Sequence, residues 1–541
     1  MRFVVGNSKV AASSIKHQVS NHFQQNDSKP IEGGPMKLKK IAALLAVAGI
    51  SAPAFATNGM NMEGYGPIAT GMGGASMAYD NGTAAVMNNP ATLALSGQGS
   101  RIDLALGFLG PDVSSRSAAW GSRGSDADSF LMPAFGYKKT VGKLTHGFGI
   151  FAQGGMGAEY SSNSAMDATS HGTTFGGGAM SGGQKQRSEL GVGRILFPLA
   201  YQVDDKLTIG GSADIVWGGL DILWSEDSVG FFGAINQNKV SGATWATLGG
   251  MGVVPGGKRG AMGGTMIDTF VANFGGAFTD FHWGHFAFND NSAFTQEAMG
   301  YGLAGKLGLT YKVNDRLTIG ATYHSKTAMK DFEGDATLSF KVTAGGVPAV
   351  IPVASKVKVI DFQWPETFGL GFAYQATDKL MVAADYKRLN WSDVMKNFHM
   401  RFTANATQTG MAAAFASTVL DYEYYQNWKD QDVINLGVAY KMDDKLTLRA
   451  GYNHASNPVP NNTVNFLFPA TVEDHYTIGF GYAFTKASDL NFSMTFAGKN
   501  TVKESVVETL TGAGAAGTTP KSANTIDHSQ LSWQVMYSHN F

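Results

Sequence analysis

The chain has 541 residues, a length suited to a barrel with long loops, and only 15% of them are charged. Its formal net charge of −1 predicts no electrostatic field that would attract nucleic acid. The absence of Cys excludes disulfide frameworks, thiolate metal sites and Cys nucleophiles.

The N-terminal part has the pattern of a secretory leader. Residues 1–35 show no periodicity, and we expect them to be disordered or absent from the mature protein. Met36 begins a basic stretch that leads into the apolar segment Ile41–Ile50 and a small-x-small cleavage site at Ala54–Ala56. Because the apolar segment is too short to span a bilayer, we predict a signal peptide over 36–56 with Met36 as the true start. A membrane anchor helix is the alternative.

Residues 57–98 lack the alternation of a strand. Gly, Met and other small residues dominate this segment, which contains Asn88-Asn89-Pro90-Ala91 near its end. Irregular backbone cannot be satisfied in lipid, so the segment is not expected to span the membrane. It is suited to packing inside a barrel lumen as a plug, and a flexible periplasmic tail is the alternative.

A turn pattern then recurs along the chain. Each copy starts with Tyr, continues with a short polar turn and in its closest form reaches Leu six residues later. The close copies are Tyr201–Gly210, Tyr311–Gly320, Tyr374–Ala383 and Tyr440–Arg449, and the looser copies are Tyr137–Gly147 and Tyr482–Phe492. Because apolar residues alternate with small or polar ones on the flanks, the pattern predicts antiparallel strands joined by tight turns.

The flanking residues also indicate which solvent the strands face. Leu303, Leu307 and Leu309 share one face of a predicted strand, whereas Lys306 and Gly308 share the other. Strands of about ten residues with this period and an aromatic residue at the apolar end are typical of transmembrane β-barrels. A soluble β-sandwich, whose strands also alternate, is the alternative.

Six hairpins account for twelve strands, and Arg101–Phe108 and Leu531–Phe541 add a first and a last strand. The sequence therefore predicts an all-β fold, a 14-stranded antiparallel transmembrane β-barrel over residues 99–541. Asp204-Asp205 and Asp443-Asp444 lie in the repeated turns and are interpreted as turn residues, not as an acid/base pair.

The connections opposite the short turns are longer, as expected for extracellular loops. They fall near 160–188, 218–298, 341–356, 395–430, 457–472 and 498–527. The 218–298 connection is rich in aromatic residues, and Ile267, Phe270, Val271 and Phe274 have helical spacing. Its candidate solute-binding residues are Phe270, Phe274, Phe278, Phe281, Trp283 and Phe286. Such residues form either an exposed landing site for a hydrophobic solute or a cap of loops packed together.

Several stretches resemble the FadL-type family of outer-membrane long-chain fatty acid transporters, which includes aromatic-hydrocarbon channels. The likeness runs from about Thr57 to Phe541 and rests on five motifs. These are the segment with Asn89-Pro90-Ala91, Phe151–Tyr160, Trp364-Pro365-Glu366, Asn390-Trp391-Ser392, and Asp443–Pro460 with its Pro458-Val459-Pro460.

The resemblance implies a barrel closed by an N-terminal hatch over 57–98, with an inward kink in the third strand. Its ligand would leave sideways through the wall at that kink, and Thr57–Met62 would shift when ligand binds. The implied residues are Gln153, Gly154, Gly155, Met156 and Gly157 at the kink, and Thr57, Asn58, Gly59, Met60, Asn89, Pro90 and Ala91 in the hatch. An ordinary Gly-rich strand end is the alternative for the kink.

Lys306, His324 and Arg449 point inward by strand parity and are candidates to bind a carboxylate, although lumen charges also pair with one another. His282 and His285 are too few to predict a metal site. We find no catalytic constellation, and we expect no enzyme activity, no cofactor and no nucleic-acid partner. The predicted function is a passive uptake channel for fatty acids or hydrocarbons in the outer membrane of a Gram-negative bacterium.

The expected partners are hydrophobic small molecules, outer-membrane lipid and the barrel insertion machinery. The terminal Phe541 on an alternating strand is similar to the signal that this machinery reads. A general porin or a barrel-anchored surface protein is the alternative function.

Overall fold

The computed structural model describes residues 58–117, 121–160, 185–249, 260–274, 276–290, 296–505 and 524–541, which belong to one compact unit. Residues 1–35, the predicted signal peptide 36–56 and Thr57 lie outside the described residues, as do most of the connections near 160–188 and 498–527. Within the described ranges, no helix has both the length and the apolar character that crossing a bilayer requires.

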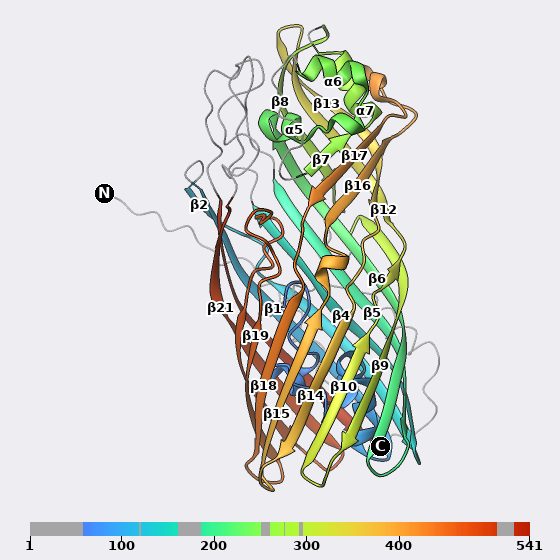
Figure 1. Ribbon diagram of the computed structural model, residues 1–541, viewed down its shortest axis with the longest axis vertical. Coiled ribbons are helices and arrows are strands. Elements are labelled where there is room, and N and C mark those ends of the chain that lie inside the picture. The colour runs from blue at the N-terminus through green and yellow to red at the C-terminus, as the bar shows by residue number, and fades with distance from the viewer. Residues whose placement is uncertain are drawn as a thin grey trace, which may run out of the picture. The chain divides into compact units, whose positions relative to one another are not determined.

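A closed antiparallel barrel forms the main body (Figure 1). Its wall follows one path of hydrogen-bonded neighbours that leaves β1 and returns to it. In order, the strands on this path are β1 (Gly99–Ser117), β3 (Phe130–Val141), β4 (Leu144–Tyr160), β5 (Gln186–Gln202), β6 (Leu207–Asp227), β9 (Ala298–Lys312), β10 (Leu317–His324), β14 (Thr367–Gln375), β15 (Leu380–Leu389), β18 (Gln431–Lys441), β19 (Leu446–Ala455), β20 (Asp474–Ala483), β21 (Ser488–Lys503) and β22 (Thr525–Asn540). Closure leaves no unpaired edge in lipid and excludes a two-layer sandwich.

The sheet contains 22 strands in the described part of the chain, more than the fourteen predicted. The additional strands are β2 (Gly121–Gly124), β7 (Gly260–Gly263), β8 (Phe278–Phe288), β11 (Ala328–Met329), β12 (Phe332–Ala344), β13 (Val347–Ile360), β16 (Asn397–Ala404) and β17 (Val419–Tyr425). Five of them, β7, β8, β13, β16 and β17, lie wholly or largely in connections that were predicted as loops and that contribute strands of their own.

Most of these strands form one ladder that starts at the far end of β6. It runs from β6 through β8, β12, β13, β16 and β17 to β7, and we call it the extension. Short helices complete the extension (Figure 1). They are α5 (Ser228–Ala234), η3 (Gln237–Lys239), α6 (Gly242–Gly249), α7 (Thr265–Ala272) and η5 (Gly410–Phe415). The helix α7 confirms the helical spacing around Phe270.

Along each strand, successive side chains point alternately to the outer face and to the inner face of the wall. Leu303 and Leu307 are 64% and 65% exposed on the outer face, whereas Lys306 between them is 2% exposed. At the short turns, Asp443 Oδ1 accepts the backbone N–H groups of Lys445 and Leu446 at 2.8 and 2.9 Å, and Asp204 binds its turn in the same way. These hydrogen bonds lower the pKa of both carboxyl groups, as expected for turn residues.

The N-terminal segment, Asn58–Ser96, lies inside the barrel (Figure 1). It contains α3 (Pro67–Thr70), η1 (Gly82–Ala84), α4 (Ala85–Asn88) and η2 (Pro90–Ser96). Inward side chains from separate parts of the wall bind it, because Asp103 on β1 accepts from Thr83, Thr495 on β21 donates to Glu63, and Asp385 on β15 accepts the N–H of Ser76. The segment therefore spans the lumen from wall to wall.

Inward glycines allow the wall to approach this segment. A Cβ atom added at any of them would come within 3.0 Å of the segment, closer than real Cβ contacts. We call the following residues the glycine belt: Gly136 on β3, Gly210 on β6, Gly308 on β9, Gly320 on β10, Gly437 on β18 and Gly451 on β19. Their partners include Thr83, Asn89, Met77 and Met72, so the belt contacts most of the segment's length.

The aromatic residues predicted to form an outer apolar loop are instead mostly buried. Phe270 and Phe281 are 0% exposed, and their ring centroids lie 5.3 Å apart. Phe278, Trp283 and Phe286 are likewise buried, and Phe274 is partly buried. These side chains form the packed core of the extension, as the alternative of mutually packed loops predicts, because burial of aromatic rings stabilises a fold with little other core.

Candidate ligand path and wall opening

The ladder between β3 and β4 ends early. Pairing stops at Phe135 and Ile150, although β3 stays paired with β1 as far as Phe130 and β4 stays paired with β5 as far as Tyr160. Beyond this interruption, the N–H of Asp126 donates to Glu159 O at 2.8 Å. The unpaired stretch between residues 130–134 and 151–157 is therefore bounded at both ends, and we call it the ladder gap.

A bulge turns β4 toward the lumen at the ladder gap. The register with β5 shifts between Ala152 and Gly154. Gly154 still pairs with Val192 on β5, and on its other side it bridges Asn61 of the N-terminal segment. The N–H of Gly155 donates to Met60 O at 3.1 Å. A Cβ atom at position 154 would overlap Met60 O and the Trp364 ring, so only glycine allows this approach. The stretch Gln153–Gly157 that the resemblance singles out lies at this bulge.

A hydrogen-bonded cluster joins β4 to the segment. Gln153 Nε2 donates to Asn61 Oδ1 at 2.7 Å and to Tyr65 Oη at 2.8 Å. Tyr65 Oη also lies 2.6 Å from Gln153 O, to which it donates. Tyr65 was not predicted, and Asn61 was included only as part of Thr57–Met62. Their partner Gln153 lies about ninety residues away in the chain, where local pattern carries no signal.

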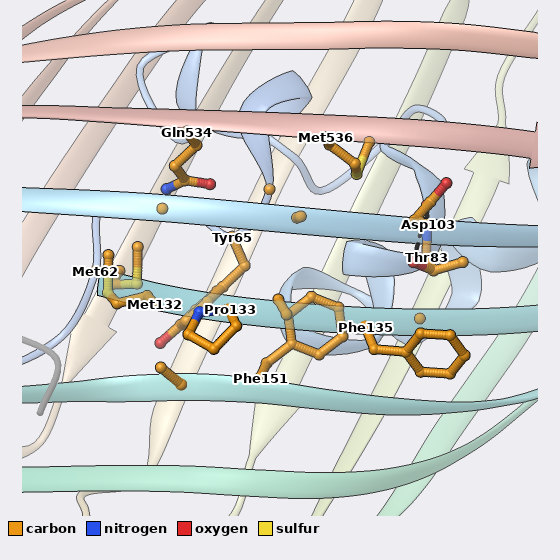
Figure 2. A pocket seen from close by; sticks show the side chains of 16 residues that line it. Met62, Tyr65, Thr83, Asp103, Met132, Pro133, Phe135, Phe151, Gln534 and Met536 are labelled. Carbon is orange, nitrogen blue, oxygen red and sulfur yellow. Dashed lines mark hydrogen bonds between the residues drawn. The ribbon is translucent and has the colours of Figure 1, made fainter. Parts of the chain in front are cut away.

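A small cavity of about 30 Å³ lies behind the ladder gap. Figure 2 shows side chains converging on it from β1, β3, β4, β22 and the segment. Its lining includes Met62, Tyr65, Met132, Pro133, Phe151, Gln534 and Met536. This volume holds about one water molecule, so a larger guest must displace side chains, and flexible Met residues make such displacement inexpensive.

Aromatic rings continue from the extension toward this bulge. Trp224 stacks on Phe286 with centroids 5.3 Å apart, and it borders a cavity of about 10 Å³ together with Phe398. Phe398 contacts Phe468 at 4.9 Å and stacks on Phe362 at 6.0 Å.

A second group of rings lies beside the bulge. The centroid of Trp391 on η4 (Trp391–Asp393) lies 5.4 Å from that of Trp364 and 5.3 Å from that of Trp428. Trp364 borders Gly154, and Trp391 borders Gly59 of the segment. We call the two groups of rings the aromatic path.

The three basic candidates point inward, as predicted, and each binds a group of the wall or the segment. Lys306 forms an ion pair with Asp214, which also pairs with Arg194 at 2.8 Å. His324 Nε2 bonds to the carbonyl of Asn88 at 3.0 Å. Arg449 donates to Asn491 at 3.0 Å. The sequence did not identify Arg194 and Asp214, because the register between neighbouring strands decides which charges meet.

The two histidines of β8 are structural. His285 Nδ1 bonds to Ser225 Oγ at 2.8 Å, and His282 Nε2 bonds to Thr343 Oγ1 at 3.0 Å. Burial lowers the pKa of His285 to about 4 and lowers that of His282, so both are neutral near pH 7. In the part of the chain that the structure describes, no three His, Cys, Asp or Glu side chains are grouped to hold a metal ion.

Curated relatives match parts of this chain. Outer membrane protein P1 of Haemophilus influenzae is 28% identical over 192 residues, which is 35% of this chain and 36% of that protein. An uncharacterized protein in the phosphoenolpyruvate carboxykinase gene 5′ region of Chlorobium limicola is 55% identical over 73 residues, which is 13% of this chain and 36% of that protein. The chain thus aligns with about a third of either relative.

Solved structures match most of the chain. The toluene transporter TodX of Pseudomonas putida is 29% identical with a TM-score of 0.68, over 88% of this chain and 99% of that chain. The toluene transporter TbuX of Ralstonia pickettii is also 29% identical, with a TM-score of 0.64 and the same coverage. A FadL homologue of Pseudomonas aeruginosa, 15% identical with a TM-score of 0.59 over 88% of this chain and 99% of that chain, has a similar fold.

The model of the outer membrane protein transport protein family (OMPP1/FadL/TodX) matches residues 43–530. This match confirms the family resemblance and the outer-membrane location predicted from sequence. It also agrees with the closed barrel. The chain belongs to the OMPP1/FadL/TodX family and is an outer-membrane transport protein rather than an enzyme.

Proposed function

We propose that this protein takes up small hydrophobic compounds, with monoaromatic hydrocarbons favoured over long-chain fatty acids. TodX and TbuX, which share 29% identity with this chain over most of its length, are toluene transporters. The aromatic path offers rings on which an aromatic solute can pack. Lys306, His324 and Arg449, the groups considered for a carboxylate, are bound to the wall or the segment instead.

The solute enters at the extension, follows the aromatic path to the Trp residues near Gly59, and leaves through the ladder gap into the membrane. The observation that carries this route is the interrupted ladder between Phe135 and Asp126, with a cavity directly behind it. Lateral release suits the solute because each apolar CH₂ group gains about 0.8 kcal/mol on leaving water, a gain that release into the aqueous periplasm forfeits.

In this proposal the N-terminal segment is the hatch. Its main part, from Met72 to Ala91, stays seated because the glycine belt contacts it around the wall. Only Asn58–Met62, attached to β4 through Gln153 and Gly155, moves to admit the solute. A general porin would instead require an open lumen, so low ion conductance of the purified protein in planar bilayers also belongs to the proposal.

The outer face contacts membrane lipid, and the C-terminal strand is the part presented to the insertion machinery. Phe541, 65% exposed at the end of β22, supplies the terminal aromatic residue for that recognition.

The test fills the ladder gap without touching the bulge. Ala134 lines the cavity from β3, and Ala134→Trp should reduce uptake of labelled toluene by cells at least about tenfold, because the side chain occupies the exit. Ala321→Trp is the matched control, since Ala321 on β10 lines a lipid-facing groove of about 870 Å³ on the outer face of the wall. Unchanged uptake by a correctly assembled Ala134→Trp variant would exclude lateral exit at this place.

A further inference from the structure

Three hydrogen-bond acceptors lie buried without partners on one part of the inner wall. They are Nε2 of His475 on β20, and Nε2 of His528 and Oε1 of Gln530 on β22. The three side chains are 0%, 6% and 3% exposed, respectively. A buried polar atom without a partner costs free energy, so these three acceptors together favour a bound group that can donate a hydrogen bond.

Strand register brings these residues together. His475 pairs with Ala497 on β21, and Ala497 pairs with Gln530, so these residues form one row across three strands. His528 lies two residues from Gln530 along β22, and therefore on the same face of the sheet. Because Ala497 carries only a methyl group, the longer side chains flank a short one. We call His475, His528 and Gln530 the acceptor site.

Hydrogen bonds fix the tautomer of both imidazoles and hold the Gln530 amide. His528 Nδ1 donates to the carbonyl of Pro469 at 2.7 Å, and His475 Nδ1 bonds to Asn453 Oδ1 at 2.8 Å. When Nδ1 of a neutral imidazole carries the hydrogen, Nε2 can only accept. Gln530 Nε2 donates to Ser532 at 2.7 Å, which leaves its carbonyl oxygen free. The acceptor site therefore presents three lone pairs and requires a hydrogen-bond donor.

The surroundings decide what kind of donor fits. On β1, which is the next strand, Val113 lies opposite His528 and Pro111 lies opposite Gln530. Val113 and the nearby Ile526 are 3% and 0% exposed, and both belong to the hydrophobic core. A hydrated metal ion gains nothing from such walls, whereas a molecule with an apolar body and one hydroxyl group packs against them and donates its single hydrogen to one of the three acceptors.

We propose that the acceptor site binds the hydroxyl group of phenols or alcohols inside the lumen. This inference rests on the proposed function, because the solute must first reach the lumen along the hydrophobic route. It adds a selectivity that an apolar channel lacks: a hydroxylated compound is preferred over the hydrocarbon of the same shape, since the hydrocarbon leaves the acceptors unpaired.

The test compares two ligands that differ by one hydroxyl group. Equilibrium dialysis of the purified full-length protein in detergent, with labelled 4-ethylphenol and labelled ethylbenzene, measures both affinities. His528→Phe should weaken 4-ethylphenol binding at least about tenfold and change ethylbenzene binding less than about twofold. Gln530→Leu should act in the same direction.

The matched control is His454→Phe. His454 on β19 is exposed and pairs with Asp474 at 2.8 Å, so the same substitution there should leave both affinities unchanged. Equal losses for both ligands in His528→Phe, or no loss for either, would overturn the inference. Binding of Zn²⁺ that disappears in His528→Phe, without selectivity for 4-ethylphenol, would assign a metal site instead. Ethylbenzene binding without that selectivity refutes this inference alone, whereas failure of both ligands to bind refutes the proposed function too.

Discussion

The glycine belt and the ladder gap are two parts of one wall that meet the same segment in opposite ways. At the belt, Gly210 and Gly308 are direct register partners, so the ladder stays intact while the segment packs against it. At the gap, Gly154 lies in a bulge, and β4 exchanges its partner β3 for the segment. Both regions need glycine for close approach, but only the gap gives up hydrogen bonds of the wall.

This contrast indicates that the two parts of the segment have different roles. The part seated on the belt packs against the wall without weakening the barrel, because each wall strand keeps both neighbours. The part at the gap replaces a wall contact, so its movement and the state of the wall are linked. Substitutions in the two regions should therefore differ in kind as well as in size.

The largest effect is expected at the gap, from Trp364→Ala. Trp364 is 1% exposed, borders Gly154 and contacts Trp391, so truncation leaves a large hole and should lower the free energy of unfolding by about 3–5 kcal/mol. Guanidinium unfolding measures the change. Trp533→Ala, on the lipid-facing side of β22, is the control with a smaller expected effect, and an equal loss in both variants would contradict a special role for the gap.

The next effect is expected at the belt, from Gly308→Val. A Cβ atom there overlaps Asn89 and the Pro90 ring, so the segment must shift, at a cost of about 1–3 kcal/mol. Chymotrypsin should then cleave the N-terminal segment faster than in the unchanged protein, because the segment contains Tyr65 and Tyr79 but no Lys or Arg. Gly305→Val on the same strand is the control, because a Cβ atom at Gly305 meets only Ser212 O at 3.3 Å. Equal cleavage of the two variants would show that the belt does not seat the segment.

A smaller effect is expected from Gln153→Ala, which removes the hydrogen bonds to Asn61 and Tyr65 at a cost of about 1 kcal/mol each. The amide of Gly155, bonded to Met60 O, should exchange its hydrogen faster in mass-spectrometric measurements. Gln534→Ala changes another residue of the same cavity and should leave this exchange unaltered. If exchange at Gly155 is as slow as before, Gln153 does not attach the segment to β4.

The smallest effect is expected far from both regions, from Asp443→Ala in a short turn. Because backbone hydrogen bonds lower the pKa of Asp443 from its ordinary value of 3.8, its carboxylate stabilises the fold above that pH. This stabilisation is lost as the pH falls through the lowered pKa. The variant should therefore melt slightly earlier than the unchanged protein at pH 7, and the difference should shrink at pH 3. A difference that grows on acidification would exclude this role.

The sequence predicts the barrel well where solvent decides the pattern. Because lipid lies on one side and the lumen on the other, residues such as Leu307 and Lys306 lie on opposite faces, and apolar and polar residues alternate in the sequence as a result. Inside the extension the same reading fails. Phe278 and Phe281 pack in a core built from distant strands, and their spacing does not distinguish a strand from a loop.

The site was predicted only in part. The position of Gln153–Gly157 came from family resemblance, because nothing local distinguishes a bulge from a Gly-rich strand end. Partners such as Tyr65 depend on contacts across the lumen. The unpartnered nitrogens of His475 and His528 become visible only when the bonds to their other ring nitrogens are known.

The length of β6 has a consequence for the first encounter with solute. The strand has 21 residues and runs without interruption from a short turn into the extension. At about 3.3 Å per residue it measures roughly 70 Å, and with a strand tilt of about 35–45° it rises roughly 50 Å along the barrel axis, which exceeds the roughly 30 Å hydrocarbon thickness of a bilayer. On the proposed orientation, the rings around Trp224 near the far end of β6 lie beyond the hydrocarbon layer. A solute in the surrounding water therefore meets the extension before it meets the hydrocarbon layer.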